Sequence, residues 1–426
     1  MRQLRSIPTF QSLWIRDYRL LWLGQVTTSL GQWMDQTARS WLIYKITGSP
    51  LQLGLVSMAR GLPLLLFGVV AGVVADRYGR KKQLIIAQVV NAILNLILAS
   101  LIVTGRIQEW HIYVTAFFAG TVQAFQQPAR QVLINDLVGK DHLLNAVSLN
   151  SAAFNLSRSL GPAIGGVLIQ AVGVGWSYYT QAAFYAFATV WTFQIRVPDS
   201  SKPVTYAKGE KVPSFFESAR EGFAYIASHK IILALMVLGL APILLGMPYT
   251  SLMPIFAIDI LHGNARTQGA LLSSVGVGAV IGALTIASLG RKQGSGKLLI
   301  LGAAGFGLSL VLFSRSPVLL MAMAFTFLAG LSNSSYTSQD QTIIQTLTPS
   351  RVRGRVLGVY MLNRGLMPIG SLLAGVLAQY FGGPTAVTIM GGSCLVLAIV
   401  VAIAVPDIWK SHLLPDNEEQ PAAQAS

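Results

Sequence analysis

Twelve apolar stretches of membrane-spanning length follow one another along the sequence, and they constrain the fold more than any other feature. A spanning helix needs about 20 mostly apolar residues. Only 11% of the residues are charged, against roughly 25% in a typical soluble domain. We therefore predict an all-α polytopic membrane protein with twelve transmembrane helices. The predicted spans cover residues 18–45, 51–75, 84–104, 111–129, 146–170, 176–195, 231–258, 268–289, 298–314, 317–339, 356–380 and 385–405.

The basic residues indicate which side of the membrane holds the ends of the chain. An even number of spans places both termini on the same side. The loops after odd-numbered spans contain few Lys or Arg residues, whereas the N-terminus and the loops after even-numbered spans contain many. Because basic residues favour cytoplasmic loops, we expect both termini in the cytoplasm. The four basic residues in the odd-numbered loops are Lys45, Arg106, Arg266 and Arg315.

The sequence repeats itself at about half its length. The triplet GRK at 79–81 returns at 290–292, and GGVLIQAVG at 165–173 returns as AGVLAQYFG at 374–382. Repeats of this kind predict two pseudo-symmetric six-helix bundles. The expected domains are an N-terminal bundle, a cytoplasmic linker ending in an amphipathic helix, a C-terminal bundle and a disordered cytoplasmic tail, at residues 1–195, 196–230, 231–405 and 406–426.

Charged residues inside the spans point to a polar interior. Such residues are costly in a bilayer and face the bundle interior or a wet cavity. Spans 3, 6, 9 and 12 contain none, so we expect them to form the lipid-facing scaffold. Asp35 lies deep in span 1, with Arg39 one helical turn further on. Two interpretations of Asp35 stay open: a proton carrier, or the partner of Arg39 in a structural ion pair.

The other charges inside the spans are arginines, which would give a polar lining a net positive charge. We expect a cavity that favours anionic or carboxylate-bearing amphiphiles, with an indole for stacking and amides for hydrogen bonds. The alternative is that these arginines only bind backbone carbonyls or neighbouring side chains. The cavity candidates are Trp33, Arg39, Arg60, Gln126, Gln127, Arg158, Asn333, Tyr336 and Arg364.

Small residues and prolines suggest where helices touch and bend. Small residues four positions apart let helix backbones approach closely in a membrane. Spans 2, 5, 8 and 11 carry such pairs, so we expect these spans to form the contacts between the halves; the alternative is that glycine is simply common in membrane helices. Span 7 contains three prolines, which kink a helix and are expected to border the cavity. The residues are Gly68, Gly72, Gly161, Gly165, Gly278, Gly282, Ser371 and Gly375, and Pro242, Pro248 and Pro254.

Two motifs give this chain a family resemblance. The loop after span 2 resembles the major facilitator superfamily signature G-x-x-x-D-R-x-G-R-K through Gly72, Asp76, Arg77, Gly79, Arg80 and Lys81. GPAIGG, with Gly161, Pro162, Gly165 and Gly166, resembles the end of the superfamily's antiporter motif, although Ser148 and Ser157 replace two expected glycines. The segments KITGSPLQLG, PARQVLINDL and REGFAYIASH resemble a bacterial efflux branch that includes the enterobactin exporter.

The resemblance implies a secondary active transporter in the bacterial cytoplasmic membrane. We expect a monomer that uses the proton gradient to export small amphiphilic molecules, drug-like or siderophore-like, by alternating access. The resemblance also implies that Asp76 caps the cytoplasmic end of span 11, near Gly354 or Val356, and latches the halves together. The alternatives are a motif that only anchors the topology, a uniporter, or a membrane receptor or regulator on the same fold.

Other functional classes find little support in the sequence. GSGK at 294–297 lacks the spacing and the hydroxyl residue of a phosphate-binding loop. The five histidines are scattered, and the single cysteine, Cys394, can form no internal disulfide. The net charge of +15 comes from residues that punctuate apolar stretches instead of clustering on a soluble face. We expect no enzymatic activity, no cofactor, no metal and no nucleic-acid partner.

Overall fold

The fold is helical throughout the residues that the structure describes. The structure is a computed structural model, and it describes residues 8–197, 215–288 and 296–410. The short elements are η2 (Pro8–Trp14) and η4 (Met247–Leu252), which are 3-10 helices, and η3 (Pro242–Gly246) and η5 (Phe256–Ile260), which are π-helical turns. The α-helices are α1 (Arg16–Thr47), α2 (Pro50–Arg77), α3 (Arg80–Val103), α4 (Glu109–Val172), α5 (Val174–Phe193), α6 (Phe215–Ser228), α7 (Lys230–Ala241), α8 (Met253–Ile255), α9 (Ala265–Ser288), α10 (Gly296–Ser314), α11 (Leu319–Leu347), α12 (Ser350–Gly365), α13 (Met367–Phe381), α14 (Gly383–Ala404) and α15 (Pro406–Lys410).

Eight segments of the described residues are long and apolar enough to cross a membrane. The other four predicted spans correspond to α1, to the two ends of α4 and to α5, which carry more polar side chains. These helices are of spanning length but fall short in hydropathy. The eight segments are Pro50–Gly68, Arg80–Val103, Lys230–Ile260, Ala265–Ser288, Gly296–Ser314, Leu319–Leu347, Arg351–Phe381 and Gly383–Ala404.

The predicted connection between spans 4 and 5 is shorter than expected. Two helices, together labelled α4, meet in this region at Gly139, the one residue of α4 with non-helical dihedral angles, φ 66° and ψ −177°. Glycine adopts a positive φ at little cost, so a single residue can break the helix there. The residues before the bend stay helical because Leu133, Ile134 and Val138 are buried in a small apolar cluster.

Helix boundaries in the second half also differ from the prediction. Helix α11 continues to Leu347, and α12 already begins at Ser350. Gly354 and Val356 therefore lie inside α12 instead of at its N-terminus. By contrast, the two predicted turn segments do divide long apolar runs, at Gly173 and Gly382, whose φ angles are 90° and 81°.

The three prolines of the seventh predicted span each mark a change of helix type. Helix α7 gives way at Pro242 to a π-helical turn, and Pro248 lies in the 3-10 segment that follows. Pro254 lies in the short helix α8, directly before the second π-helical turn. Proline donates no backbone hydrogen bond and clashes with the preceding turn, which favours a departure from regular α-helical geometry at these positions. At the predicted kinks, the segment changes between α-helical, π-helical and 3-10 geometry.

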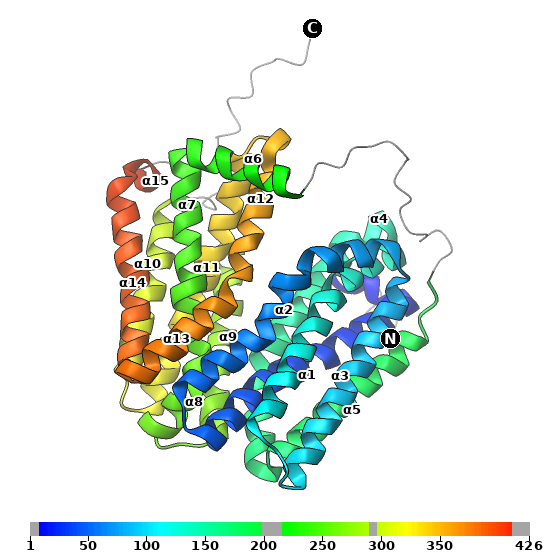
Figure 1. The fold of residues 1–426 in the computed structure, drawn as a ribbon. Coiled ribbons are helices and arrows are strands. Elements are labelled where there is room, and N and C mark those ends of the chain that lie inside the picture. Colours follow the sequence, from blue (N-terminus) through cyan, green and yellow to red (C-terminus); the bar gives the residue numbers. More distant parts are fainter. Residues whose placement is uncertain (1–7, 198–214, 289–295, 411–426) are drawn as a thin grey trace.

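The helices form two groups in space, called here the N-terminal group (α1–α5) and the C-terminal group (α7–α14) (Figure 1). The groups meet where α2 packs on α13 and where α4 packs on α9. Gly54 and Gly375 lie at the first contact, and a Cβ on Gly54 would be 3.1 Å from the Gly375 Cα. Gly166 and Gly269 lie at the second contact in the same way. The helices predicted for these contacts are therefore the ones that touch.

Two of the four predicted small-residue pairs nevertheless pack within one group. Gly161 and Gly165 of α4 lie against α1, and the pair in α9 packs on Phe327 and Leu331 of α11. A Cβ on Gly72 would meet no atom within 4 Å. The four-residue spacing thus identified helices in close contact, but it did not identify which face of each helix meets the other group.

Hydrogen bonds join the two groups at the end where α1 meets α2. The Tyr44 hydroxyl donates to Asp259, and the hydroxyl groups of Ser57 and Ser251 are 3.1 Å apart. Gln268 Nε2 donates to the Ser40 hydroxyl at 2.8 Å. Figure 1 shows the groups together at this end and diverging toward the end where α6 lies. The structure is therefore closed between the groups at one end.

We predict that cysteines at Ser57 and Ser251 form a disulfide under mild oxidation, in a background with Cys394→Ala. The two hydroxyls lie in contact, so the replacing thiols would start within reach of each other. Mass spectrometry of the linked peptides measures the yield. Gly166→Val should reduce this yield several-fold, because a Cβ there would lie 2.4 Å from the Ala265 carbonyl oxygen.

Gly72→Val is the matched control for this cross-link. Its Cβ would enter open space, so the yield should stay unchanged. If the double-cysteine protein with Gly166 unchanged forms no disulfide, the two groups of helices are not closed at this end. Equal losses from both glycine substitutions would show that the α4–α9 contact does not hold the groups together.

Candidate functional site

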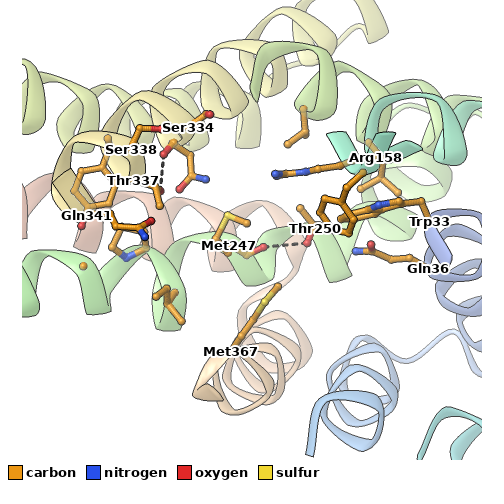
Figure 2. Close-up of a pocket in the computed structure, with 18 of the residues that line it drawn as sticks. Trp33, Gln36, Arg158, Met247, Thr250, Ser334, Thr337, Ser338, Gln341 and Met367 are labelled. Atoms are coloured by element: carbon orange, nitrogen blue, oxygen red, sulfur yellow. Dashed lines mark hydrogen bonds between the residues drawn. The ribbon is translucent and has the colours of Figure 1, made fainter. Parts of the chain in front are cut away.

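A cavity of about 570 Å³ lies between the two groups of helices. Its wall takes side chains from α1 and α4 on one side and from α7, η3, η4, α9, α11, α12 and α13 on the other (Figure 2). Among the residues that the structure describes, no three His, Cys, Asp or Glu side chains gather to hold a metal ion. The polar groups of the wall come mainly from Trp33, Gln36, Arg158, Thr250, Asn333, Ser334, Tyr336, Thr337, Ser338, Gln341 and Tyr360.

One part of the wall combines a cation with aromatic rings. The Arg158 guanidinium lies 5.7 Å from the centre of the Trp33 ring, and Phe154 meets that ring edge-on at 5.8 Å. Gly161 makes room for this arrangement, since a Cβ there would lie 2.5 Å from the Trp33 Cβ. Arg158 is the only charged side chain among the described residues that line the cavity. A guanidinium in such a place recognises carboxylate or other anionic groups.

The opposite part of the wall is a polar stripe on α11. Asn333, Ser334, Thr337, Ser338 and Gln341 all line the cavity (Figure 2). Residues three and four apart lie on one face of a helix, which explains why this set faces one space. The sequence analysis included Asn333 but missed the other four. Their recurrence at helical spacing inside an apolar span was the signal that would have found them.

The irregular segment after α7 contributes adaptable groups to the cavity. Thr250 donates from its hydroxyl to the Met247 carbonyl at 3.0 Å, within the 3-10 segment. Met247 and Met367 both line the cavity, and their flexible thioether chains can fit ligands of different shapes. Of the three prolines predicted to border the cavity, Pro242 is part of the wall, whereas Pro248 and Pro254 are not.

Four of the nine predicted cavity residues line this space: Trp33, Arg158, Asn333 and Tyr336. Arg39, Arg60, Gln126 and Gln127 are not part of its wall, and the side chain of Arg364 lies outside what the structure describes. Gln126 is buried inside the N-terminal group instead. The sequence could place these residues within spans but could not tell which helix faces turn toward the cavity.

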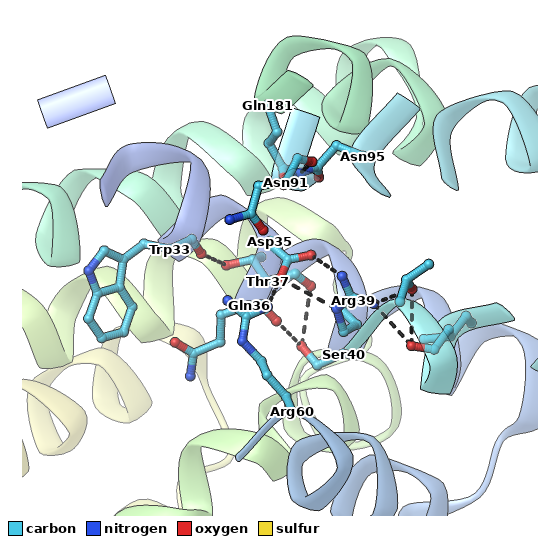
Figure 3. Close-up of polar contacts among 12 residues, drawn as sticks. Trp33, Asp35, Gln36, Thr37, Arg39, Ser40, Arg60, Asn91, Asn95 and Gln181 are labelled. Atoms are coloured by element: carbon cyan, nitrogen blue, oxygen red, sulfur yellow. Dashed lines mark hydrogen bonds and ion pairs between the residues drawn. The ribbon is translucent and has the colours of Figure 1, made fainter. Parts of the chain in front are cut away.

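Asp35 is held by two arginines (Figure 3). Its carboxylate accepts from Arg39 Nη2 at 2.8 Å and forms a second ion pair with Arg60 of α2. Arg39 also donates to Thr115 Oγ1 at 2.9 Å and to the Ile112 carbonyl of α4 at 3.1 Å. These contacts join α1, α2 and α4. Of the two interpretations left open by the sequence, they favour the structural ion pair.

The basic motif after α2 fastens helix ends within the N-terminal group. Gly79 precedes α3, and Arg80 Nη1 lies 2.5 Å from a carboxylate oxygen of Asp136 on α4. Lys81 donates to the carbonyls of Phe193 and Ile195 at 2.8 Å each, at the end of α5. Cations at a helix C-terminus satisfy its free carbonyls and its dipole. The contacts of Arg80 and Lys81 are therefore structural.

The part of the motif assigned to gating is only partly visible. The side chains of Asp76 and Arg77 lie outside what the structure describes, as does the second GRK triplet. The backbone of both residues belongs to the last turn of α2. The latch between Asp76 and the start of α12 thus stays a prediction.

Asp340 is an acidic residue that the sequence analysis missed. It was assigned to a loop because span 10 was taken to end at residue 339, whereas α11 continues for two more turns. The residue is fully buried, at 0% exposure. It lies on α11 beside Gln341 of the cavity wall.

The sequence matches the family of transmembrane secretion effectors over residues 7–424. The chain belongs to this family, a branch of the major facilitator superfamily. It is therefore a transporter-type, multi-pass membrane protein, as the motif resemblance implied.

Individual relatives agree with this placement. The chain is 26% identical over 377 residues to the staphyloferrin A transporter of Staphylococcus aureus (strain NCTC 8325 / PS 47), covering 87% of this chain and 92% of the relative. It is 25% identical over 376 residues to the enterobactin exporter EntS of Citrobacter koseri, covering 88% of each chain. The crystal structure of the nucleoside transporter NupG shares the fold, with a TM-score of 0.73 at 16% identity over 93% of this chain and 99% of NupG.

We predict that Asp35→Asn destabilises the folded protein by about 3 kcal/mol or more. The substitution leaves the buried Arg39, and with it Arg60, without the carboxylate that they share, and breaking a buried pair costs about that much. Denaturation of the detergent-solubilised protein measures the loss. The double variant Asp35→Asn with Arg60→Gln should recover part of it, since it removes one uncompensated charge.

The exposed Asp141 provides a matched control for this prediction. Asp141→Asn removes the same chemical group from the surface of the same bundle, so its unfolding midpoint should equal that of the unaltered protein. Should Asp35→Asn prove as stable as Asp141→Asn, the stability of the folded protein would not depend on the ion pairs of Asp35 with the two arginines.

Proposed function

We propose that this protein is a secondary active transporter that exports small amphiphilic molecules by alternating access. The observation that carries the proposal is a cavity whose wall is divided between two groups of helices that touch at one end only. A relative rotation of the groups would close the cavity on one side and open it on the other. The family and its exporting relatives support this function.

In this proposal the chain crosses the membrane twelve times, in two pseudo-symmetric bundles of six spans. The two ends of α4 supply spans 4 and 5, and α12 with α13 supplies span 11. The basic loops support cytoplasmic termini in a bacterial inner membrane. The closed end, where α1 meets α2, would then face outward, so the structure would correspond to a state open to the cytoplasm. The transporter acts as a monomer.

The proposed substrates are anionic amphiphiles, siderophore-like or drug-like. Arg158 supplies the one charge of the described cavity wall, and Trp33 beside it supplies a face for stacking. The stripe of hydroxyl and amide groups on α11 supplies hydrogen bonds on the other side. A mostly apolar pocket with a few placed polar groups suits a molecule that is itself amphiphilic.

The proposed driving force is the proton gradient. The sequence contains no phosphate-binding loop of the required spacing, so ATP is not proposed as the energy source. A gradient-driven exporter must bind a proton in one orientation and release it in the other. Asp76 at the end of α2 is proposed to latch the cytoplasmic ends of the two groups in the opposite orientation.

We predict that Arg158→Gln slows export of a carboxylated fluorescent dye about tenfold or more. Loss of one charge-assisted hydrogen bond removes about 1.5–3 kcal/mol, and tenfold corresponds to about 1.4 kcal/mol. Export of a cationic dye of similar size should not fall. Dye efflux from energised cells that contain or lack the protein provides the measurement, and Arg315→Gln in an exposed loop is the matched control.

The same experiment tests the function itself. A protonophore should abolish efflux if the proton gradient drives it. Retention of both dyes regardless of whether the protein is present would favour a receptor or regulator over an exporter for these compounds. Equal slowing of both dyes by Arg158→Gln would refute the role given to the charge of Arg158.

A further inference from the structure

A second buried acid lies behind the cavity wall in the C-terminal group. Asp340 is completely buried on α11, while its neighbours Thr337 and Gln341 face the cavity. Its carboxylate lies against the backbone of α7, because a Cβ on Gly239 would be 3.1 Å from Asp340 Oδ2. Gly239 itself is part of the cavity wall. The carboxylate thus lies beside a residue that lines the cavity proposed for substrate.

Tyrosines surround this carboxylate. The Tyr336 hydroxyl and the Tyr360 ring lie 3.5 Å and 3.6 Å from the same point beside Gly239, and both residues line the cavity. Neither carboxylate oxygen has a hydrogen-bond partner of ordinary geometry. Among the side chains that the structure describes, the titratable groups seen beside this carboxylate are therefore the phenols of Tyr336 and Tyr360.

The contrast with Asp35 is one of charge. Asp35 is paired with two guanidinium groups, whereas none of the ion pairs among the described residues includes Asp340. An ionised carboxylate in an apolar interior without a cation costs several kcal/mol, whereas the neutral acid avoids this cost. The same site becomes favourable for the carboxylate once water or a cation reaches it.

From this geometry we propose that Asp340 is the proton-binding site that couples substrate export to the proton gradient. The inference rests on the proposed function and names the group that the function requires. One carboxylate oxygen accepts a proton from hydronium, leaving water, and returns it to water on the opposite side; no other bond forms or breaks. Movement of α7 or α12 against α11 would open the tyrosine-lined site, because these helices supply Gly239 and Tyr360.

The first test measures protonation directly in the purified protein in lipid. Infrared difference spectra of the unaltered protein at neutral pH should contain the C=O band of a buried carboxylic acid. The band should shift in Asp340→Glu, disappear in Asp340→Asn and stay unchanged in Asp141→Asn. A missing band in the unaltered protein, or an unshifted band in Asp340→Glu, would overturn the proposal without reference to transport.

The second test separates coupling from transport in proteoliposomes with the carboxylated dye. Asp340→Asn should lower accumulation driven by an imposed pH gradient at least tenfold, while exchange of dye at equal concentrations continues. Accumulation that survives in Asp340→Asn would overturn the proposal. If the unaltered protein exchanges dye but ignores the pH gradient, the proton-coupled function fails, even where the infrared band shows a protonated Asp340.

Discussion

Charge buried in an apolar interior needs a partner of opposite sign, and this constraint decides how the N-terminal group is assembled. Asp35 draws Arg60 of α2 toward α1, and Arg39 extends the same network to α4. Arg80 then ties α3 to α4 through Asp136, and Lys81 holds the end of α5. Every helix of this group is thereby joined to a neighbour by at least one charged side chain. These contacts also fix α1 and α4 relative to each other, and these helices supply Trp33 and Arg158 to the cavity wall.

The contact between the two groups depends on other interactions than ion pairs. None of the ion pairs among the described residues joins one group to the other. The groups meet instead through glycine backbones at α2–α13 and α4–α9, and through hydrogen bonds of side chains such as Ser57 and Gln268. The one carboxylate in these hydrogen bonds, that of Asp259, is exposed, so the contacts separate without leaving a buried charge unpaired. Strong bonds within a group and weak ones between groups suit two bodies that move against each other.

Local patterns predicted the helices well and their faces poorly. Apolar length located helices, and the glycine-containing turns at Gly173 and Gly382 divided the long runs correctly. The bend at Gly139 was missed because an amphipathic, charged segment resembles a loop until its apolar side finds a partner. Asp340 was missed for a related reason, since an acid usually marks the end of a span and here does not. Which of the candidate residues face one cavity depends on helix rotation and packing, which no stretch of sequence encodes alone.

The alternating pitch after α7 has a consequence for the shape of the binding space. A π-helical turn holds more residues than an α-helical turn, and a 3-10 turn holds fewer. Exchange of one turn type for another at η3 or η4 would rotate the following side chains about the helix axis and would also change the length of the segment, because a 3-10 helix rises about 2.0 Å per residue and an α-helix about 1.5 Å. Met247 and Thr250 would then change position in the cavity wall. The shape of the cavity can therefore be altered within one segment, without any movement of one group of helices against the other.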